Sequence, residues 1–408
     1  MQLAVDLHSH SGYAGGVGNV SLDDIAVAMQ YKGIDVYGCG DCLFPLRTEE
    51  LKKCLIETEE GLFTYQNQPA RFLLQTEVIF TVSLKGYKNR ILAHHLIFFP
   101  SFESIAKMQV LMTKWGQKNT IGRPFIACKD QQELEDRLFE IAAIHPLLEI
   151  VPAHVMTPEG IMGSRNRLHS IQEFYGRFTP QIRIIETGLS ADPDMLCRIP
   201  DLANLTMISN SDTHSAALNR IGREFTILET DSLSYPNIIS SLRNNRIVMT
   251  SEFFPGEGRY YMTGHRANRD GHTQAVIFED HAPDDLICPV CGKKMFLGVR
   301  QRCLELTDNG IIPIKREFRH LLPLLEVIAV AHGKGVQTKL VWEEYQIILQ
   351  CFESEIDLWR SDVCTIEYKL DKRVKEETLK TIIAVRNEQY HFCPSGYDGV
   401  YGVLEIIK

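Results

Sequence analysis

The 408-residue sequence lacks several features that mark specialised classes of protein. It has no run of about 20 apolar residues, which excludes an ordinary transmembrane helix and gives no reason to expect a membrane partner. Its N-terminus has no basic region and no cleavage site, so we expect no secretion signal. Internal repeats, low-complexity tracts and long disordered linkers are also missing. These absences favour an ordinary folded protein.

An excess of positive charge is also missing. Lys and Arg number 43, Asp and Glu number 52, and the formal net charge is -9. This balance argues against a protein that coats nucleic acid, but it leaves room for a narrow basic groove on an acidic body. The cysteines number eleven, an odd count, and no secretion signal accompanies them. We therefore expect reduced thiols and a cytoplasmic protein.

The length and composition predict more than one domain. Hydrophobic residues make up 44% of the chain and charged residues 23%, as in ordinary globular proteins. A chain of this length suggests two or three domains. The pattern of apolar and helical segments changes at a Pro- and Gly-rich segment at residues 254–258. We expect domains at residues 1–254, 255–310 and 311–408.

Residues 1 to about 250 alternate short apolar runs with helical patterns. This alternation predicts an α/β fold with a parallel sheet or barrel. In barrels of this kind, functional side chains lie at the C-terminal ends of the strands. The apolar runs occupy residues 3–7, 34–37, 71–78, 91–99, 148–153, 182–185 and 205–208.

Histidine and carboxylate side chains follow these runs. A bare His-x-His pair is more often a surface feature, and a polar residue after a strand is often a helix cap. Eight such groups in one domain instead favour a cluster of two or three metal ions, such as zinc, manganese or iron, with Glu77 as the bridging ligand. Such clusters hydrolyse phosphoesters. The candidate ligands are His8, His10, Asp41, Glu77, His95 (or its neighbour His94), His154, Asp212 and His214.

The segment from about residue 255 to 310 carries a second candidate metal site. Cys288-Pro-Val-Cys291-Gly292 has the spacing of a zinc knuckle, in which the glycine allows a tight turn. A single knuckle supplies two ligands, so histidines such as His265 or His272 must complete the site. The alternative is a turn that binds no metal. From about residue 310 the pattern is mainly helical, at 321–331, 341–352 and 375–387, and an apolar strand is expected at 400–407.

The motifs together resemble one known family. Asp6-Leu-His8-Ser-His10-Ser is similar to the opening motif of the PHP (polymerase and histidinol phosphatase) superfamily. Later blocks, in order, are similar to its endonuclease Q family over nearly the whole chain. These blocks include Gly38-Cys-Gly-Asp41, Thr76-Glu77-Val78, His94-His95-Leu96-Ile97, Pro152-Ala153-His154, Ser209-Asn-Ser-Asp212-Thr-His214, Cys288-Pro-Val-Cys-Gly-Lys and Gly396-Tyr-Asp-Gly-Val-Tyr-Gly402.

The resemblance implies a fold and an activity. The implied fold is a distorted (β/α)7 PHP barrel with a small zinc-binding insert and a helical C-terminal domain. The implied activity is that of a DNA repair endonuclease, associated with the nucleoid when acting, which cuts 5′ of deaminated bases (uracil, hypoxanthine, xanthine) and abasic sites. No motif for a sliding clamp is visible.

The resemblance also implies roles for the candidate ligands. Asp212, Glu77 and Asp41 are the expected catalytic carboxylates, and the cofactors are two or three ions of zinc, manganese or magnesium. One ion would be held by His8, His10, Glu77 and Asp212, a second by Glu77, His95 and His154, and a third by Asp41 and His214. His265, Cys288 and Cys291 would hold a structural zinc.

The sequence departs from the family pattern in a few places. Cys39 stands where a threonine is usual, and Gln75 where a glycine is usual. In the insert, Asn268 stands where relatives have a zinc ligand, and asparagine is a poor ligand for zinc. Either His272 replaces it or the zinc site is weakened.

DNA binding requires cationic groups on the phosphates. The loop at residues 156–166 is a candidate wall for a pocket that holds a flipped base, although it could equally be a plain surface loop. A solvated charged face is likewise the alternative for the basic residues. The candidate DNA-binding residues are Arg165, Asn166, Arg223, Lys293, Lys294 and Arg300.

Two other functions remain open from the sequence. A PHP phosphatase could use the same metals on a small phosphate monoester, although it would need neither the insert nor the helical tail. A DNA-lesion binder without catalysis could have kept the fold, although the full ligand set argues against that.

Overall fold

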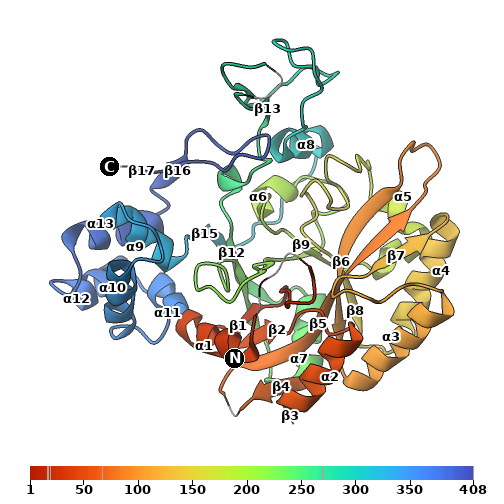
Figure 1. Cartoon of the computed structure of the whole chain (residues 1–408), viewed down its shortest axis with the longest axis horizontal. Helices are drawn as coiled ribbons and strands as arrows, with labels where there is room; N and C mark the ends of the chain where they lie inside the picture. The colour runs from red at the N-terminus through yellow and green to blue at the C-terminus, as the bar shows by residue number, and fades with distance from the viewer. Residues whose placement is uncertain (16–17, 19, 67, 269–270, 408) are drawn as a thin grey trace.

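The computed structural model describes residues 1–15, 18, 20–66, 68–268 and 271–407 and shows a mixed α/β protein built around a large sheet (Figure 1). The path of this sheet is β15-β12-β11-β1-β2-β5-β4-β3, and β6, β7 and β8 join it at β5 and β6. Its described strands are β1 (Gln2–Asp6), β2 (Val36–Gly38), β3 (Leu55–Glu59), β4 (Leu62–Tyr65), β5 (Arg71–Val82), β6 (Ile91–Phe99), β7 (Phe125–Cys128), β8 (Glu149–Pro152), β11 (Phe225–Glu229), β12 (Ile247–Glu252) and β15 (Phe318–His320).

The strands run in both directions. β1 pairs parallel with β2, and β2 with β5, but β5 pairs antiparallel with β6 and β1 with β11. A short connection at residues 83–90 joins β5 to β6, and strands joined this tightly must be antiparallel. The α/β class is therefore confirmed, but the sheet is mixed rather than parallel. The closed seven-stranded barrel stays a prediction, because β9 (Ile184–Glu186) and β10 (Thr206–Ile208) form a separate parallel pair.

The two faces of the strands enter different cores. Leu3 and Val5 of β1, Leu73 of β5 and Leu96 of β6 belong to one apolar cluster, which α7 also joins. Neighbouring residues of opposite parity, such as Ala4, belong to a larger cluster shared with the outer helices. Successive side chains of a strand point to opposite faces, so both faces of these central strands are buried.

Helices cover the outside of the sheet. The α1 helix begins where the Ser21 side chain accepts a hydrogen bond from Asp24 N, and it ends at Gly33, whose φ of 82° suits glycine. In Figure 1, α3 and α4 flank the sheet on the side away from the C-terminal helices. The described helices up to residue 257 are α1 (Leu22–Lys32), α2 (Pro45–Cys54), α3 (Phe102–Lys114), α4 (Gln131–Ala142), α5 (Gln172–Tyr175), α6 (Pro193–Leu196), α7 (Tyr235–Arg243), and the short 3-10 turns η1 (Gly176–Gln181) and η2 (Pro255–Glu257).

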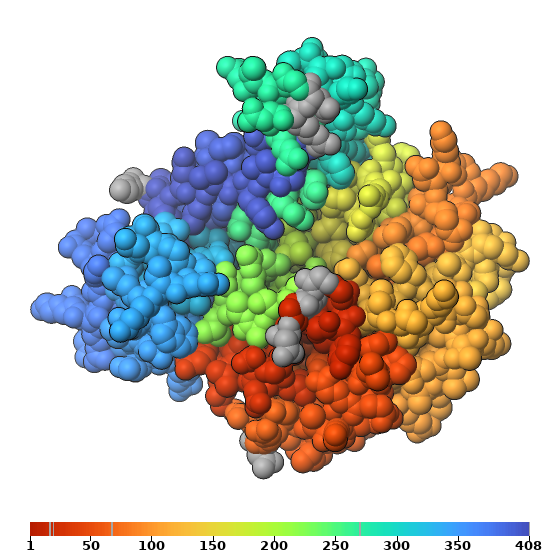
Figure 2. Space-filling view, in the orientation of Figure 1, coloured from red at the N-terminus to blue at the C-terminus, as the bar shows by residue number. Residues whose placement is uncertain are grey.

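The remaining chain forms two further parts. The β13 (Thr263–His265) and β14 (Val276–Phe278) ribbon projects from one end of the molecule, beside α8 (Val299–Leu306) (Figures 1 and 2). Helices then gather on one side of the sheet, and β16 (Tyr390–Phe392) pairs with β17 (Leu404–Ile406). These helices are α9 (Leu324–His332), α10 (Lys339–Leu349), α11 (Glu355–Arg360), α12 (Val363–Leu370) and α13 (Glu376–Arg386). Among the described helices, none is both long enough and apolar enough to cross a bilayer.

Candidate metal centre and its cavity

The two histidines that follow β1 lie together in the interior. His8 and His10 are 0% and 2% exposed, and their ring centroids are 5.2 Å apart. His8 Nδ1 lies 3.0 Å from Glu186 Oε1, and His10 Nδ1 lies 3.2 Å from Asp41 Oδ1. A carboxylate on Nδ1 fixes the orientation of an imidazole and leaves Nε2 available to a metal ion.

Asp212 and Glu77 supply carboxylates to the same place. Asp212 Oδ1 lies 3.3 Å from His8 Nε2 and 3.2 Å from His10 Nε2. Glu77 Oε2 lies 3.5 Å from His10 Nε2. Within the described part of the chain, His8 Nε2, His10 Nε2 and Asp212 Oδ1 are buried and have no hydrogen-bond partner. Buried polar atoms are rarely left unsatisfied, and these imidazole and carboxylate donors fit a divalent metal ion.

Three overlapping groups of ligands meet here. Within each group, the ligand atoms lie within 4.8 Å of one another. Because two residues belong to two groups each, the arrangement suits more than one ion. The groups are His8, His10 and Glu77; His10, Asp212 and His214; and Glu77, His94 and His154.

The structure corrects the choice between His94 and His95. Glu77 faces Leu96 across the β5–β6 ladder, so His94 shares the face of Glu77 and His95 lies on the other face. His94 Nδ1 lies 2.7 Å from Glu77 Oε1. His95 Nε2 instead lies 2.6 Å from Tyr175 Oη, and burial lowers the pKa of His95 to about 3. His94 therefore replaces His95 as the candidate ligand.

Asp41 lies beside the centre but in none of its three groups. Its Oδ1 contacts His10 Nδ1, and its Oδ2 accepts a hydrogen bond from Ser11 N at 2.7 Å. These contacts place Asp41 where it orients His10, and its predicted pairing with His214 at an ion stays a prediction. Two buried cysteines, Cys39 and Cys42, flank Asp41 in the chain with a Cys-x-x-Cys spacing.

Three site residues have left-handed backbone. The φ angles are 55° at Asp41, 29° at His154 and 45° at Asp212. Such angles are uncommon outside glycine and tend to occur where function requires a particular side-chain position. The strand ends therefore turn sharply at the site, which aims these side chains at one centre.

The electrostatics of the centre favour a cation. Burial alone lowers the pKa of His8, but the nearby carboxylates of Glu186, Asp212 and Glu77 raise it to about 9. Burial likewise opposes the charge of His10, but Asp212, Asp41 and Glu77 raise its pKa to about 10. Despite burial, which raises it, the pKa of Glu77 is held well below its usual range by His94 and His154. The carboxylates thus create a strong demand for positive charge.

Several residues of the site were not among the sequence candidates. Glu186 contacts His8 and also accepts a hydrogen bond from His154 N at 2.8 Å. Arg123 Nη1 lies 3.3 Å from Glu77 Oε2, and Thr157 Oγ1 lies 2.6 Å from His154 Nδ1. Glu186 follows the predicted strand at 182–185, so its position was the signal that could have found it. Arg123 lies in none of the quoted motifs.

A cavity of about 410 Å³ opens beside the metal centre. Residues of the centre line it together with aromatic and arginine side chains. The Arg259 guanidinium lies 5.6 Å from the Tyr260 ring centroid and 5.4 Å from that of Tyr401. The lining includes His94, His154, Asp212, Arg123, Arg165, Arg223, Phe253, Arg259, Tyr260, Phe296 and Tyr401.

The candidate DNA-binding residues fall into two sets. Arg165 and Arg223 line the cavity. Asn166 is buried, and its side chain bonds Leu92 N and Gly160 O, so it holds the loop rather than facing DNA.

The other three candidates lie in the insert. Lys293 and Lys294 are exposed. Arg300 pairs with Asp280 at 2.8 Å, so part of its charge is already neutralised. None of the three lines the cavity.

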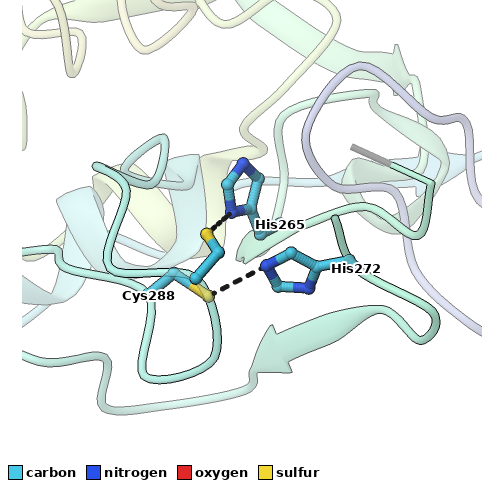
Figure 3. Close-up of side chains that lie close together, drawn as sticks. His265, His272 and Cys288 are labelled. Atoms are coloured by element: carbon cyan, nitrogen blue, oxygen red, sulfur yellow. Dashed lines mark hydrogen bonds between the residues drawn. The ribbon is translucent and has the colours of Figure 1, made fainter. Parts of the chain in front are cut away.

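The insert gathers a second set of ligands (Figure 3). His272 Nε2 lies 3.3 Å from Cys288 Sγ, and His265 Nδ1 lies 3.4 Å from Cys291 Sγ. The four ligand atoms lie within 4.8 Å of one another. Asn268 is outside this group, and His272 is the fourth candidate ligand in its place. Two imidazoles and two thiols are a common zinc ligand set.

Buried carboxyl groups lie next to Glu186. Burial raises the pKa of Glu224 to about 7 and that of Glu252 to about 8. Glu224 accepts hydrogen bonds from Leu189 N at 3.2 Å and Phe253 N at 3.0 Å. It therefore holds two residues of the cavity wall in place.

We expect Glu252→Gln to flatten the pH dependence of stability. The pKa of Glu252 is raised from 4.5 to about 8, so the folded protein binds the extra proton between these values and loses stability as pH rises through them. The variant cannot ionise, so its Tm relative to wild type should rise from about pH 5 to about pH 8. Thermal unfolding across this range measures the difference. Glu229→Gln, at an exposed site, should follow wild type, and parallel curves for Glu252→Gln would contradict the assignment.

Comparisons with known proteins identify relatives of this arrangement. The family model named MJ0043 C-terminal domain matches residues 323–389. The protein MJ0043 of Methanocaldococcus jannaschii is 32% identical over 246 residues, which cover 58% of this chain and 30% of that protein. This chain thus spans less than a third of that relative. The protein YqxK of Bacillus subtilis is 25% identical over 429 residues, covering 99% of each chain.

Solved structures extend the likeness to the whole chain. The lesion-specific endonuclease PfuEndoQ of Pyrococcus furiosus matches with a TM-score of 0.83 and 28% identity over 100% of this chain and 96% of that one. The chain has the endonuclease Q fold. A complex of endonuclease Q with a 27-mer duplex, which carries an abasic lesion at the active site, matches with a TM-score of 0.82 and 28% identity over 100% and 97% of the chains. The resemblance to endonuclease Q that the motifs indicated is therefore confirmed over the whole chain.

Proposed function

We propose that this protein is a DNA repair endonuclease that hydrolyses the phosphodiester 5′ of uracil, hypoxanthine, xanthine or an abasic site. The buried metal centre that opens onto a cavity carries this proposal. The whole-length likeness to endonuclease Q bound to abasic DNA supports it. We assign the metal-binding and catalytic part to residues 1–254, the insert to 255–310 and the mainly helical part to 311–408.

We assign two or three divalent ions, of zinc, manganese or magnesium, to the three ligand groups. Ions held there supply Lewis acidity toward a phosphate oxygen and toward the attacking water. Glu77 and His10, which belong to two groups each, would contribute ligand atoms to more than one ion. Glu186 and Asp41 hold the imidazoles of His8 and His10 in a fixed orientation.

Arginines around the cavity bind the DNA backbone in this proposal. Arg123, Arg165 and Arg223 line the cavity, and a guanidinium binds phosphate oxygens in pairs. Arg123 contacts Glu77, so a phosphate that it binds lies next to the metal centre. Because the whole chain carries a net charge of -9, the positive charge that binds DNA is confined to the surroundings of the cavity in this proposal.

The aromatic side chains of the cavity receive the lesion nucleotide in this proposal. A base turned out of the stack can pack against aromatic rings and arginine planes. Uracil and hypoxanthine present a carbonyl oxygen beside a ring N–H, where cytosine and adenine present an amino group. A pocket whose polar groups pair with uracil or hypoxanthine leaves some of these groups unpaired when cytosine or adenine enters. Each unpaired group costs about 1–3 kcal/mol.

We expect Arg259→Ala to weaken cleavage of lesion DNA. The guanidinium lies against Tyr260 and Tyr401, and base stacking on such a platform contributes about 1–3 kcal/mol, which corresponds to roughly a 5- to 150-fold loss in kcat/KM. Initial rates of cleavage of a uracil-containing duplex measure this loss in kcat/KM. Arg246→Ala, outside the cavity, is the matched control, and equal rates for both variants would exclude this role for Arg259.

Incubation with manganese or magnesium and a panel of single-lesion oligonucleotides tests the function. We expect a cut on the 5′ side of each recognised lesion and no cut in undamaged DNA. Release of phosphate from a simple phosphomonoester without strand cutting would favour the phosphatase instead. Lesion-specific binding without cutting under all metal conditions would favour a non-catalytic binder.

We assign one structural zinc to His265, His272, Cys288 and Cys291. A bound zinc would fix the loops of this small insert, which has an apolar cluster of only a few side chains. We expect His272→Ala to lower the zinc content by one per chain, as measured by elemental analysis. Asn268→Gly, which tolerates the φ of 59° at that position, should keep it. Loss of zinc from the Asn268 variant, with retention in the His272 variant, would reverse the assignment.

A further inference from the structure

The ribbon formed by β16 and β17 presents three metal-ligating side chains on one face. His391 pairs with Glu405 across the ribbon, and Cys393 N donates to Val403 O at 2.8 Å, which continues the ladder by one step. Side chains two residues apart on a strand share a face, and directly paired residues do so as well. His391, Cys393 and Glu405 therefore lie on the same side of the ribbon.

The opposite face of the ribbon is anchored in the protein. Tyr390 and Phe392 are 3% and 7% exposed, and their rings lie 5.5 Å and 5.4 Å from the Phe254 ring. Tyr390 Oη donates to His320 O at 3.0 Å. This packing of the inner face fixes the position of the ribbon, and it therefore also fixes the backbone that carries the side chains of the outer face.

The three ligand atoms on the outer face converge. His391 Nε2 lies 3.1 Å from Glu405 Oε2. One ligand atom from each of the three residues lies within 4.8 Å of the other two, and all three residues are exposed. A divalent ion could therefore reach them from solvent. None of the three belongs to the metal centre or to the insert cluster.

We propose that His391, Cys393 and Glu405 form a separate binding site for one zinc ion. An imidazole nitrogen, a thiolate sulfur and a carboxylate oxygen are the donors that zinc takes in proteins, and the thiolate disfavours magnesium and calcium. Three protein ligands leave the fourth tetrahedral position to water or to an added ligand. Binding replaces the Cys393 S–H bond with an S–Zn bond and releases one proton to solvent.

Alkylation of Cys393 tests the site in the full-length protein. The free thiolate is the nucleophile, so a zinc-bound sulfur should react slowly with iodoacetamide. Added zinc should slow alkylation of Cys393 by at least ~10-fold, read by peptide mass spectrometry. Cys364 is an exposed cysteine on α12 and serves as an internal control whose rate should not change.

Variants identify the ligands. His391→Ala and Glu405→Ala should each remove the protection of Cys393 by zinc, whereas His169→Ala, at another exposed histidine, should keep it. Cys393→Ser should lower the zinc bound per chain by one at saturating free zinc. Equal alkylation rates with and without zinc, or protection that survives both ligand variants, would leave an ordinary cross-strand His–Glu pair and overturn the proposal.

Discussion

Asp212→Asn is expected to reduce cleavage of lesion DNA by about 10³-fold or more while leaving DNA binding intact. Asp212 Oδ1 lies between the Nε2 atoms of His8 and His10, and the amide that replaces it is a poor metal ligand. Metal ions contribute several kcal/mol to phosphoester hydrolysis, and each 1.36 kcal/mol is tenfold in rate. Single-turnover cleavage and a filter-binding titration measure the two properties separately.

The choice of asparagine keeps the backbone unchanged. Asp212 has a φ of 45°, and Asn is among the few residues that adopt this region readily. An activity loss in Asp212→Asn therefore reports the carboxylate rather than strain. Asp231→Asn, at an exposed position, is the matched control and should cleave at the wild-type rate. Unchanged cleavage by Asp212→Asn would rule out this carboxylate as a catalytic metal ligand.

His94→Asn and His95→Asn are expected to fail in different ways. His94 contacts the bridging carboxylate of Glu77, so its loss should lower metal content and reduce cleavage by about 10²-fold or more. His95 lies on the other face of β6, where its loss leaves the Tyr175 hydroxyl without its partner. That should cost about 1–3 kcal/mol of stability and leave the metal content unchanged.

Metal analysis, thermal unfolding and cleavage rates separate the two outcomes. His94→Asn should bind less metal at a Tm near that of the metal-free wild type. His95→Asn should unfold at a lower temperature but cleave near the wild-type rate per folded molecule. The reverse pattern would restore His95 as the ligand and would contradict the strand register seen here.

The same pair of histidines explains a limit of sequence reasoning. Residues 91–99 were predicted as a strand, and β6 has those bounds. Which of two adjacent histidines faces the site depends on the register of β6 against β5, in which Glu77 faces Leu96. A shift of one residue would exchange the two faces, and both faces of this strand are buried. No pattern in the strand itself could decide between them.

Several strands of the sheet were also missed. β3 and β4 form a hairpin, and β11 and β12 pair antiparallel, but the sequence analysis assigned no strand to these segments. In β3, for example, three of five residues are exposed, so its apolar signal is weak.

The insert shows a position at which the structure favours one of two alternatives that the sequence leaves open. The sequence left His272 as one of two outcomes at the position where Asn268 departs from the family pattern. The fold brings His272 to within 3.3 Å of Cys288 Sγ. The two residues are 16 positions apart in the chain, so only the path of the intervening residues could bring them together.

The sequence by itself determined the class of fold, the resemblance to endonuclease Q and most of the candidate ligands at the strand ends, because apolar periodicity and the positions of His and Asp after each strand are local properties. Only the tertiary structure decided which face His94 takes, that Asp41 and Glu186 orient histidines, and that Arg123 and Arg259 reach the cavity. Those outcomes depend on register and on loops from distant parts of the chain, whose packing no short stretch of sequence specifies.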